Sequence, residues 1–447
     1  MWYDKIKETD PELHGYIGEE LERQRDGLEM IPSENFTSLA VMQASGSILT
    51  NKYSEGYSGK RYYGGNEFID KVESLAIERA KKLFNVPYAN VQPYSGSPAN
   101  LSVYFAICKP GDTIMGLNLN DGGHLTHGFK SSVTGQIFNS VPYHVRKDGY
   151  IDIDEARKLA VENKPKLIWI GCSAYPREFP FEEFAKIADS VDAYLAADIA
   201  HISGLVIAGV HKSPSDYVHI ITTTTHKTLR GPRGAMIMVT DKGLRKDPDL
   251  GKKIDKMVFP GTQGGPHNHT TAGIAIALHE ASKPQFKEYA EQIVKNAKVL
   301  AGALSKKGLT VVTGGTDNHL ILIDLTPFGK GLGIFAEQAL GEAGITVNKN
   351  TIPNEQSSSF YPSGVRLGTP AITTRGMKEK EMEEIGGFYA EVINEIKGMN
   401  LPDDKEERQK CIEEFKARIK ETPRIKDVRK RVSAMASKFP LYSQMQM

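Results

Sequence analysis

Between residues 31 and 282, the hydrophobic positions alternate between a helical period and short continuous runs. Apolar residues recur at three- and four-residue spacing in residues 70–84 and 181–191, which predicts two amphipathic helices. The continuous runs predict five strands, TIMGLN, KLIWIGC, AYLAAD, VHIITTT and AMIMV. Several of these runs are apolar on both faces, as in a parallel sheet covered by helices on both sides. The pattern therefore predicts an α/β fold.

The pattern changes after about residue 283, where long helical segments alternate with the apolar runs HLILIDL and ITVNKN. Residues 1–30 have the character of a charged helix. We therefore predict a helical arm (1–30), a large domain (31–282) and a smaller α+β domain (283–447). Residues 403–431 mix both charges densely, and their apolar residues keep helical spacing, which predicts one exposed amphipathic helix.

Composition narrows the class of protein without identifying a reaction. A chain of 447 residues is too long for one ordinary core, and its net charge of +1 gives no overall field that favours nucleic acid or anionic membrane. The three cysteines form no CxxC pair, which is typical of a reducing compartment. The first thirty residues lack an apolar signal core, and no run is long enough to span a bilayer. We expect a soluble cytoplasmic protein.

Polar residues at the predicted strand ends are candidates for chemistry, because ligands of open α/β sheets bind beyond the carboxyl ends of the strands. Asp198 and His201 follow one apolar run, His226 and Lys227 follow another, and Ser173 follows a third. A buried carboxylate and a buried lysine both need partners. A pyridoxal phosphate enzyme provides both, a covalent bond for the lysine and a protonated ring nitrogen for the carboxylate. Lys227 taken alone is better explained as a surface lysine, and only together with Asp198 does a cofactor lysine become an equal alternative.

Further segments could serve the same cofactor. Ser95, Gly96 and Ser97 precede a helical pattern and could hold a phosphate, although an ordinary serine cap has the same sequence. His124 could stack on a pyridine ring. The histidines lack cysteine partners or an HExxH frame, so we predict no metal site. In SGVRLGTPA, Arg366 could bind a carboxylate or be a surface arginine.

With these segments in view, the chain resembles the serine hydroxymethyltransferase (glycine hydroxymethyltransferase) family over residues 28–374. Ten blocks carry the resemblance in the family's order: IPSENFTS, LTNKYSEGYSGKRYYGGNEFID, NVQPYSGSPAN, GGHLTHG, DIAHISGL, TTTTHKTLRGPRG, FPGTQGGP, GGTDNHL, ITVNKN and SGVRLGTPA. The resemblance implies a fold-type I (aspartate aminotransferase-like) enzyme, with a mostly parallel seven-stranded sheet in its large domain. It also implies reversible conversion of L-serine and tetrahydrofolate to glycine and 5,10-methylenetetrahydrofolate.

The resemblance also implies roles for matching positions. Lys227 would carry pyridoxal phosphate covalently, Asp198 would pair with the ring nitrogen, and His124 would stack on the ring. The other implied cofactor contacts are Ser95, Gly96, Ser97, Ser173, His201, His226 and Arg233, with Tyr53, Gly261, Thr262 and Gly264 from the partner subunit. The implied catalytic set is Lys227, Glu55, Tyr63, His226 and Thr224. The implied substrate contacts are Ser33, Tyr63, Glu55, His201 and Arg366, and the implied folate contacts are Glu55, Tyr62, Leu119, Leu125 and Asn350.

Some questions stay open at this point. A site shared between subunits implies a homodimer, which could assemble further into a tetramer, and the one-carbon carrier could be tetrahydrofolate or a related pterin. A threonine aldolase-like enzyme that acts without folate and a silent scaffold protein are the competing hypotheses. The tyrosine–glutamate block argues against the first, and the intact lysine, aspartate, arginine and glutamate argue against the second.

Overall fold

The structure is a computed structural model in which residues 3–445 are described. The chain divides into two compact units. One contains the residues up to Glu34 together with those from Lys295 onward, and the other runs from Asn35 to Val294. The predicted arm, large domain and small domain stay a prediction, because a compact unit is not by itself an independently folding domain.

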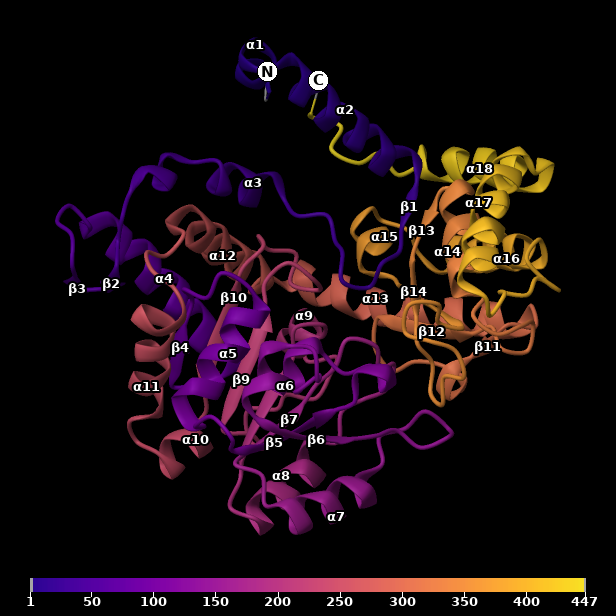
Figure 1. The fold of residues 1–447 in the computed structure, drawn as a ribbon. Coiled ribbons are helices and arrows are strands. Elements are labelled where there is room, and N and C mark those ends of the chain that lie inside the picture. The colour runs from indigo at the N-terminus through magenta and orange to yellow at the C-terminus, as the bar shows by residue number, and fades with distance from the viewer. Residues whose placement is uncertain (1–2, 446–447) are drawn as a thin grey trace. The chain divides into compact units, whose positions relative to one another are not determined.

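The unit from Asn35 to Val294 contains a seven-stranded sheet in the order β4-β10-β9-β8-β7-β5-β6 (Figure 1). Neighbouring strands are parallel except at β10, which is antiparallel to both β9 and β4. The predicted α/β fold with a mostly parallel seven-stranded sheet is thus confirmed. The five predicted strands are all present, and the sheet adds β4 and β6. The strands are β4 (Tyr88–Asn90), β5 (Thr113–Leu117), β6 (Asn139–Tyr143), β7 (Leu167–Ile170), β8 (Tyr194–Asp198), β9 (Ile220–Thr224) and β10 (Ala235–Val239).

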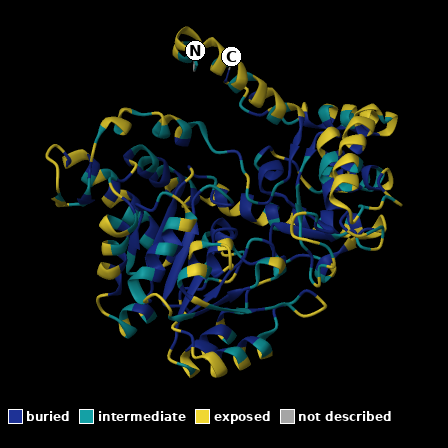
Figure 2. Ribbon diagram, in the orientation of Figure 1, coloured by how far each residue is buried: buried dark blue, intermediate teal, exposed yellow. Residues whose placement is uncertain are grey.

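Both faces of this sheet are covered. In β7, Leu167 and Trp169 belong to one hydrophobic cluster, whereas Ile168 and Ile170 belong to another. Alternate residues of a strand point to opposite faces, so each cluster fills one side of the sheet. Figure 2 shows the strands as buried and the helices around them as partly exposed. The helices of this unit are α3 (Leu39–Ser45), α4 (Glu67–Phe84), α5 (Gly96–Ile107), α6 (Val133–Ile137), α7 (Ile153–Asn163), α8 (Phe181–Ser190), α9 (Ser203–Ile207), α10 (Asp241–Lys246), α11 (Leu250–Lys256) and α12 (Asn268–Ala281).

The other unit is built around a four-stranded antiparallel sheet in the order β11-β12-β15-β14. The segment ITVNKN, predicted as one strand, is divided at Val347, and its first part, β13, pairs with β1 instead of joining this sheet. The strands are β1 (Leu28–Glu29), β11 (Thr310–Val311), β12 (Leu320–Asp324), β13 (Ile345–Thr346), β14 (Asn348–Asn350) and β15 (Gly364–Gly368). The helices are α1 (Asp4–Thr9), α2 (Pro11–Asp26), α14 (Gly333–Glu342), α15 (Pro370–Thr374), α16 (Glu379–Asn394), α17 (Lys405–Glu421) and α18 (Pro423–Ala436), and α13 (Pro284–Lys306) precedes β11.

The prediction of a single exposed helix over residues 403–431 is wrong in two respects. The segment forms two helices, α17 and α18, because Pro423 has no N–H to continue the first helix and instead occupies the first turn of the second. Its apolar face is also covered, since Phe415 is buried and its ring lies 4.8 Å from that of Phe335 on α14. The segment is therefore part of the core of its unit.

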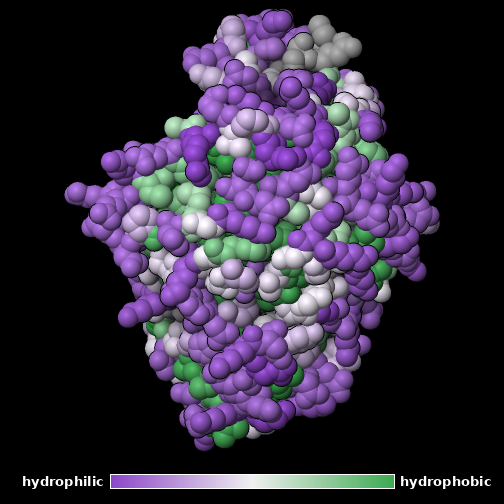
Figure 3. All heavy atoms as spheres, turned by 90° about the vertical axis from the view of Figure 1, so that its right-hand side faces the viewer, coloured by the Kyte–Doolittle hydropathy of each residue, from purple (hydrophilic) through white to green (hydrophobic). Residues whose placement is uncertain are grey.

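The surface has the character expected from the composition. Figure 3 shows one face of the molecule, on which hydrophilic residues cover most of the area and hydrophobic residues gather in smaller areas between them. Among residues 3–445, no helix is both long enough and apolar enough to cross a membrane.

Candidate active site

Two neighbouring strands bring the central candidate residues to one edge of the sheet. Asp198 is the last residue of β8, and Lys227 lies three residues beyond the end of β9. These strands are parallel, with Asp198 paired to Thr222, so both residues lie at the carboxyl ends of the strands. Ser173 follows β7 and His201 follows β8 at the same edge. This edge is where an open α/β sheet binds its ligands.

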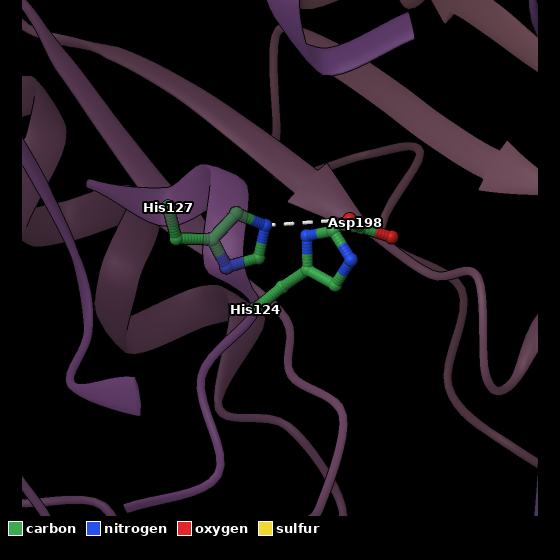
Figure 4. Close-up of side chains that lie close together, drawn as sticks. All are labelled: His124, His127 and Asp198. Carbon is green, nitrogen blue, oxygen red and sulfur yellow. Dashed lines mark hydrogen bonds and ion pairs between the residues drawn. The ribbon is translucent and has the colours of Figure 1, made fainter. Parts of the chain in front are cut away.

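Asp198 accepts hydrogen bonds from three groups, and Figure 4 shows the one from His127, with His124 nearby. Its Oδ2 accepts hydrogen bonds from Asn100 Nδ2 at 2.9 Å and from His127 Nε2 at 3.3 Å, and its Oδ1 accepts one from the Ala200 N–H at 3.0 Å. Burial opposes ionisation of this carboxyl, but the His127 hydrogen bond and the nearby His124 and Lys227 outweigh it and hold its pKa well below the usual value. Asp198 is therefore a fixed negative charge that can bind a cationic group.

His124 lies beside this carboxylate in the loop that follows β5. Its Nδ1 is 2.7 Å from Thr126 Oγ1, and that hydroxyl also accepts a hydrogen bond from Asn100 Nδ2 at 2.8 Å. Burial lowers the pKa of His124 to about 4, so the imidazole is neutral at physiological pH. Ligand atoms of His124, His127 and Asp198 lie within 4.8 Å of one another, a grouping that could also hold a metal ion.

The Ser95–Gly96–Ser97 segment forms the start of α5. Ser95 occupies the N-cap position, and its side chain makes no capping hydrogen bond among the described residues, so the ordinary serine cap is not what is found. Ser95 and Ser97 are both exposed, and the first N–H groups of a helix lack partners within the helix. A Cβ added to Gly96 would lie 3.0 Å from Thr224 Cγ2, a tight contact that either Thr224 or the helix start would have to shift to relieve.

His226 and Arg233 complete the surroundings of Lys227. Burial, together with the charges of Lys227 and Arg233, lowers the pKa of His226 to about 3, which leaves the ring neutral. Its Nδ1 is buried and has no hydrogen-bond partner among the described residues. Arg233 is exposed, and Thr224, at the end of β9, is buried. A polar bound group would satisfy the buried imidazole nitrogen.

The tyrosine–glutamate block forms a second group of candidate residues in the same unit. Tyr53 Oη donates a hydrogen bond to Glu55 Oε1 at 3.3 Å, and the rings of Tyr53 and Tyr63 meet edge to face at 5.0 Å. A Cβ added to Gly264 would lie 3.3 Å from Glu55 Oε1, so the loop from Gly261 to Gly264 lies against this block. The structure thus brings together two segments that, by the resemblance, both act in the site of the partner subunit. Thr262 Oγ1 of this loop lies 2.9 Å from Ser102 Oγ on α5.

Ser33, Arg366 and Asn350 belong to the other unit. Arg366 lies on β15, and its Nε donates a hydrogen bond to Asn348 Oδ1 at 3.0 Å. At the end of the same strand, Gly368 N donates to Met30 O at 2.7 Å, and a Cβ on Gly368 would lie 2.8 Å from Pro32. The segment that contains Ser33 therefore lies next to the strand of Arg366.

The folate candidates are distributed over both units. Leu119 and His124 line a cavity of about 490 Å³ in the unit from Asn35 to Val294. Leu125 and Tyr62 belong to the same unit and are exposed on its surface. Asn350 lies in β14 of the other unit, opposite Gly364.

Comparison with known proteins identifies the family. The family model for serine hydroxymethyltransferase matches residues 6–389. The chain belongs to the serine hydroxymethyltransferase family. It is 52% identical over 424 residues to a probable serine hydroxymethyltransferase of Rickettsia bellii, covering 95% of this chain and 99% of that protein. It is 50% identical over 440 residues to the serine hydroxymethyltransferase of a Nostoc species, covering 98% of this chain and 96% of that protein.

Serine hydroxymethyltransferases are pyridoxal phosphate-dependent transferases of fold type I that act in one-carbon, serine and glycine metabolism, and they use tetrahydrofolate. The residues at the edge of the sheet fit such a cofactor. Asp198 offers a buried negative charge for a protonated ring nitrogen, and His124 offers a neutral ring. The start of α5 offers a phosphate two hydroxyls and the N–H groups of the first turn, which a helix does not bond internally. Lys227 offers the amine that such transferases require.

The sequence did not predict three residues that contact Asp198 or His124. They are Asn100, Thr126 and His127. All three belong to the hydrogen-bond network of Asp198 and His124. Asn100 could have been found, because it is a polar residue that stands one turn after Gly96 on the helix that begins at the predicted phosphate site. Thr126 carries no such signal. His127 stands beside His124 in the same glycine-flanked loop, but its role depends on a contact with Asp198, which is distant in the chain.

Proposed function

We propose that this chain catalyses the reversible conversion of L-serine and tetrahydrofolate to glycine and 5,10-methylenetetrahydrofolate, with pyridoxal phosphate bound covalently to Lys227. The observation that carries the proposal is the position of Lys227 and an ionised, buried Asp198 at the ends of adjoining parallel strands. Family membership supports it further. The carrier is tetrahydrofolate or a related pterin.

Residues of the unit from Asn35 to Val294 would hold the cofactor. Pyridoxal phosphate, when bound, supplies an electron sink for the bond that is broken in the substrate. Asp198 would keep the ring nitrogen protonated through its negative charge, and His124 would stack on the ring. The α5 N-terminus with Ser95 and Ser97 binds the phosphate. Further contacts come from Ser173, His201, His226, Thr224 and Arg233.

Other residues bind and orient the substrates. Arg366, with Ser33, binds the carboxylate of serine bidentately and so fixes the direction of the side-chain bond. Glu55 moves a proton at the serine hydroxyl, assisted by Tyr63 and held by Tyr53. Tyr62, Leu119, Leu125 and Asn350 line the folate site.

We further propose a homodimer that can assemble further into a tetramer, with Tyr53, Glu55, Tyr63 and the loop from Gly261 to Gly264 acting in the partner's site. Support comes from a run of exposed large hydrophobic side chains, which are more typical of an interface than of a free surface. They are Ile48, Tyr53, Tyr62, Tyr63 and Phe68. The near-neutral charge gives no reason to expect nucleic acid or membrane as a partner, and the cysteine content fits the cytoplasm.

The test is glycine formation from L-serine by the purified protein, with and without tetrahydrofolate. We expect glycine formation to depend on added folate. We also expect the protein to show a visible absorbance from the lysine-bound cofactor. Lys227→Ala should lose both, whereas Lys252→Ala, an exposed lysine on α11, should lose neither. A Lys227→Ala protein that keeps the absorbance and full turnover refutes the proposal. Glycine formation without any folate favours a threonine aldolase-like enzyme instead.

A further inference from the structure

The main chain of Lys227 is held by residues outside its own strand. Its carbonyl oxygen accepts two hydrogen bonds, one from the Arg230 N–H at 3.0 Å and one from Asn35 Nδ2 at 2.9 Å. The second amide proton of Asn35 is directed at Tyr289 Oη, 2.6 Å away. Tyr289 is itself buried, on α13, and its hydroxyl donates a longer bond to Thr228 O at 3.4 Å. The lysine is thus connected to Asn35 and, through it, to α13.

Arg230 closes the same turn in an unusual conformation. Its φ is +58°, in the left-handed region that costs a residue with a Cβ some free energy and that glycine adopts more readily. The guanidinium lies 4.1 Å from the ring centre of Tyr289, and Thr37 Oγ1 donates to Arg230 O at 2.6 Å. A charged side chain on an aromatic ring is a favourable contact that compensates for the backbone strain.

We propose that Asn35, Arg230 and Tyr289 form a positioning clamp that fixes the main chain of Lys227 and thereby directs its amine towards Asp198. The inference rests on the proposed function, in which Lys227 carries the cofactor. The side chain of lysine has four rotatable bonds, so the place of its amine depends on how firmly the main chain is anchored. The three clamp residues act through Lys227 and are not catalytic themselves.

The base of the turn is held independently of the clamp. Thr225 N donates to Gly234 O at 3.0 Å, and Thr225 Oγ1 donates to Pro232 O at 2.6 Å. Gly231 N donates to Thr225 O at 2.7 Å. Loss of a clamp residue should therefore loosen the segment from Lys227 to Arg230 without unfolding the strand pair that it connects.

The test uses four variants of the full chain. Asn35→Ala removes both amide donors, Tyr289→Phe removes only the hydroxyl and keeps the ring beneath Arg230, and Arg230→Gly removes the guanidinium but suits the left-handed backbone. Tyr143→Phe is the matched control, because it removes a buried tyrosine hydroxyl that donates to Trp169 O in the same sheet, away from the clamp. The measurements are hydrogen exchange of the amides of residues 225–231 without cofactor, the rate at which the visible band develops after pyridoxal phosphate is added, and the pH dependence of that band.

We expect Asn35→Ala to slow the development of the band about tenfold, the effect of losing roughly two ordinary hydrogen bonds. It should also speed exchange of the Arg230 amide and shift the pH dependence of the band. Tyr289→Phe should do the same to a smaller degree, and Arg230→Gly should act like Asn35→Ala despite its more permissive backbone. Clamp variants that match Tyr143→Phe in all three measurements overturn the clamp while the proposed function stands. A wild-type protein that develops no band refutes the proposed function itself.

Discussion

At the scale of single residues, the site depends on which buried groups stay charged and which stay neutral. Asp198 stays ionised because its donors outweigh the effect of burial. His124 and His226 stay neutral, with pKa values lowered to about 4 and about 3, because burial is the largest influence on both. A buried anion beside the neutral ring of His124 attracts a cation, which is the electrostatic basis for holding a protonated ring nitrogen.

Burial of neutral histidines makes stability depend on pH, and His219 offers the cleanest case because it lies away from the site. Its Nδ1 accepts a hydrogen bond from Leu195 N at 2.9 Å, and burial, with Lys242 and Lys246, lowers its pKa to about 4. The unfolded chain, with a histidine pKa near 6.5, therefore binds more protons below that pH, so stability is fully present above it and falls towards pH 4. From pH 7 to pH 5 the loss should be about 2 kcal/mol for this histidine.

Urea unfolding followed by fluorescence of Trp169, which is fully buried in β7, measures this loss in the unit that contains the sheet. His219→Asn keeps an acceptor for the Leu195 N–H but cannot be protonated. Its unfolding free energy should therefore lose about 2 kcal/mol less than the wild type between these pH values. Equal losses in the two proteins would show that His219 is not the group responsible.

Glu55 is the residue to which we assign proton transfer, and Glu55→Gln tests that role. The amide keeps the size of the side chain but cannot accept a proton, so folate-dependent serine cleavage should fall about a hundredfold or more, the usual contribution of a general acid or base. The visible band of bound cofactor should be retained, because Lys227 and Asp198, which we propose to bind the cofactor, are unchanged. Glu78→Gln, on the exposed side of α4, is the control. Full activity in Glu55→Gln would remove this residue from the reaction.

At the scale of elements, the close approach of α5 to β9 forms the predicted phosphate site. Gly96→Ala places a methyl group 3.0 Å from Thr224 Cγ2, and overpacking of this kind costs about 1–3 kcal/mol. Cofactor affinity should therefore fall about tenfold or more. Thr224→Ser removes Cγ2 but keeps the hydroxyl, so the double variant should recover most of the affinity lost by Gly96→Ala. Absorbance titration with pyridoxal phosphate measures all three variants, and a double variant no better than Gly96→Ala would mean that another contact is responsible.

The elements also show what the sequence could and could not predict. Five buried strands and the helices α4 and α8 were predictable, because a continuous apolar run or a helical period is a property of the segment itself. β4 has three residues and β6 is only partly buried, so neither has a strong local pattern. The break at Thr422 was readable from Pro423. The division of ITVNKN was not, because it depends on the partner strand, β1, more than 300 residues away.

The same distinction applies to the site. Asp198 ends a strand, Lys227 lies shortly after one, and Ser95 stands at a helix start, so in each case a one-dimensional pattern indicates the position. Asn100, Thr126 and His127 act through contacts between α5, the loop after β5 and the end of β8, which only the folded chain brings together. The positioning clamp on Lys227 is of this second kind, since Asn35 and Tyr289 are 192 residues before and 62 residues after the lysine, respectively.

At the scale of the whole molecule, the remaining question is which chain supplies Glu55 to a given Lys227. In the structure, Glu55 lies beside Tyr53 and Gly264, in a segment with exposed aromatic side chains, which suits a surface that completes a partner's site. If sites are shared, a dimer of one Lys227→Ala chain and one Glu55→Gln chain contains one site with both substitutions and one site with neither. If each chain supplies its own Glu55, every site in that dimer carries one substitution.

Mixing the two inactive variants therefore distinguishes these arrangements. After random subunit exchange at equal concentrations, about half of the dimers should be mixed, each with one native site of two, so about a quarter of wild-type activity should return. The recovered activity should rise with the time allowed for exchange and should require tetrahydrofolate, like the wild type. Lys227→Ala alone, taken through the same exchange procedure, is the control, because any activity that it gains cannot come from mixed dimers. Activity that stays at the sum of the two parents would place Glu55 in the same chain as the lysine that it serves, because subunit exchange would then create no native site.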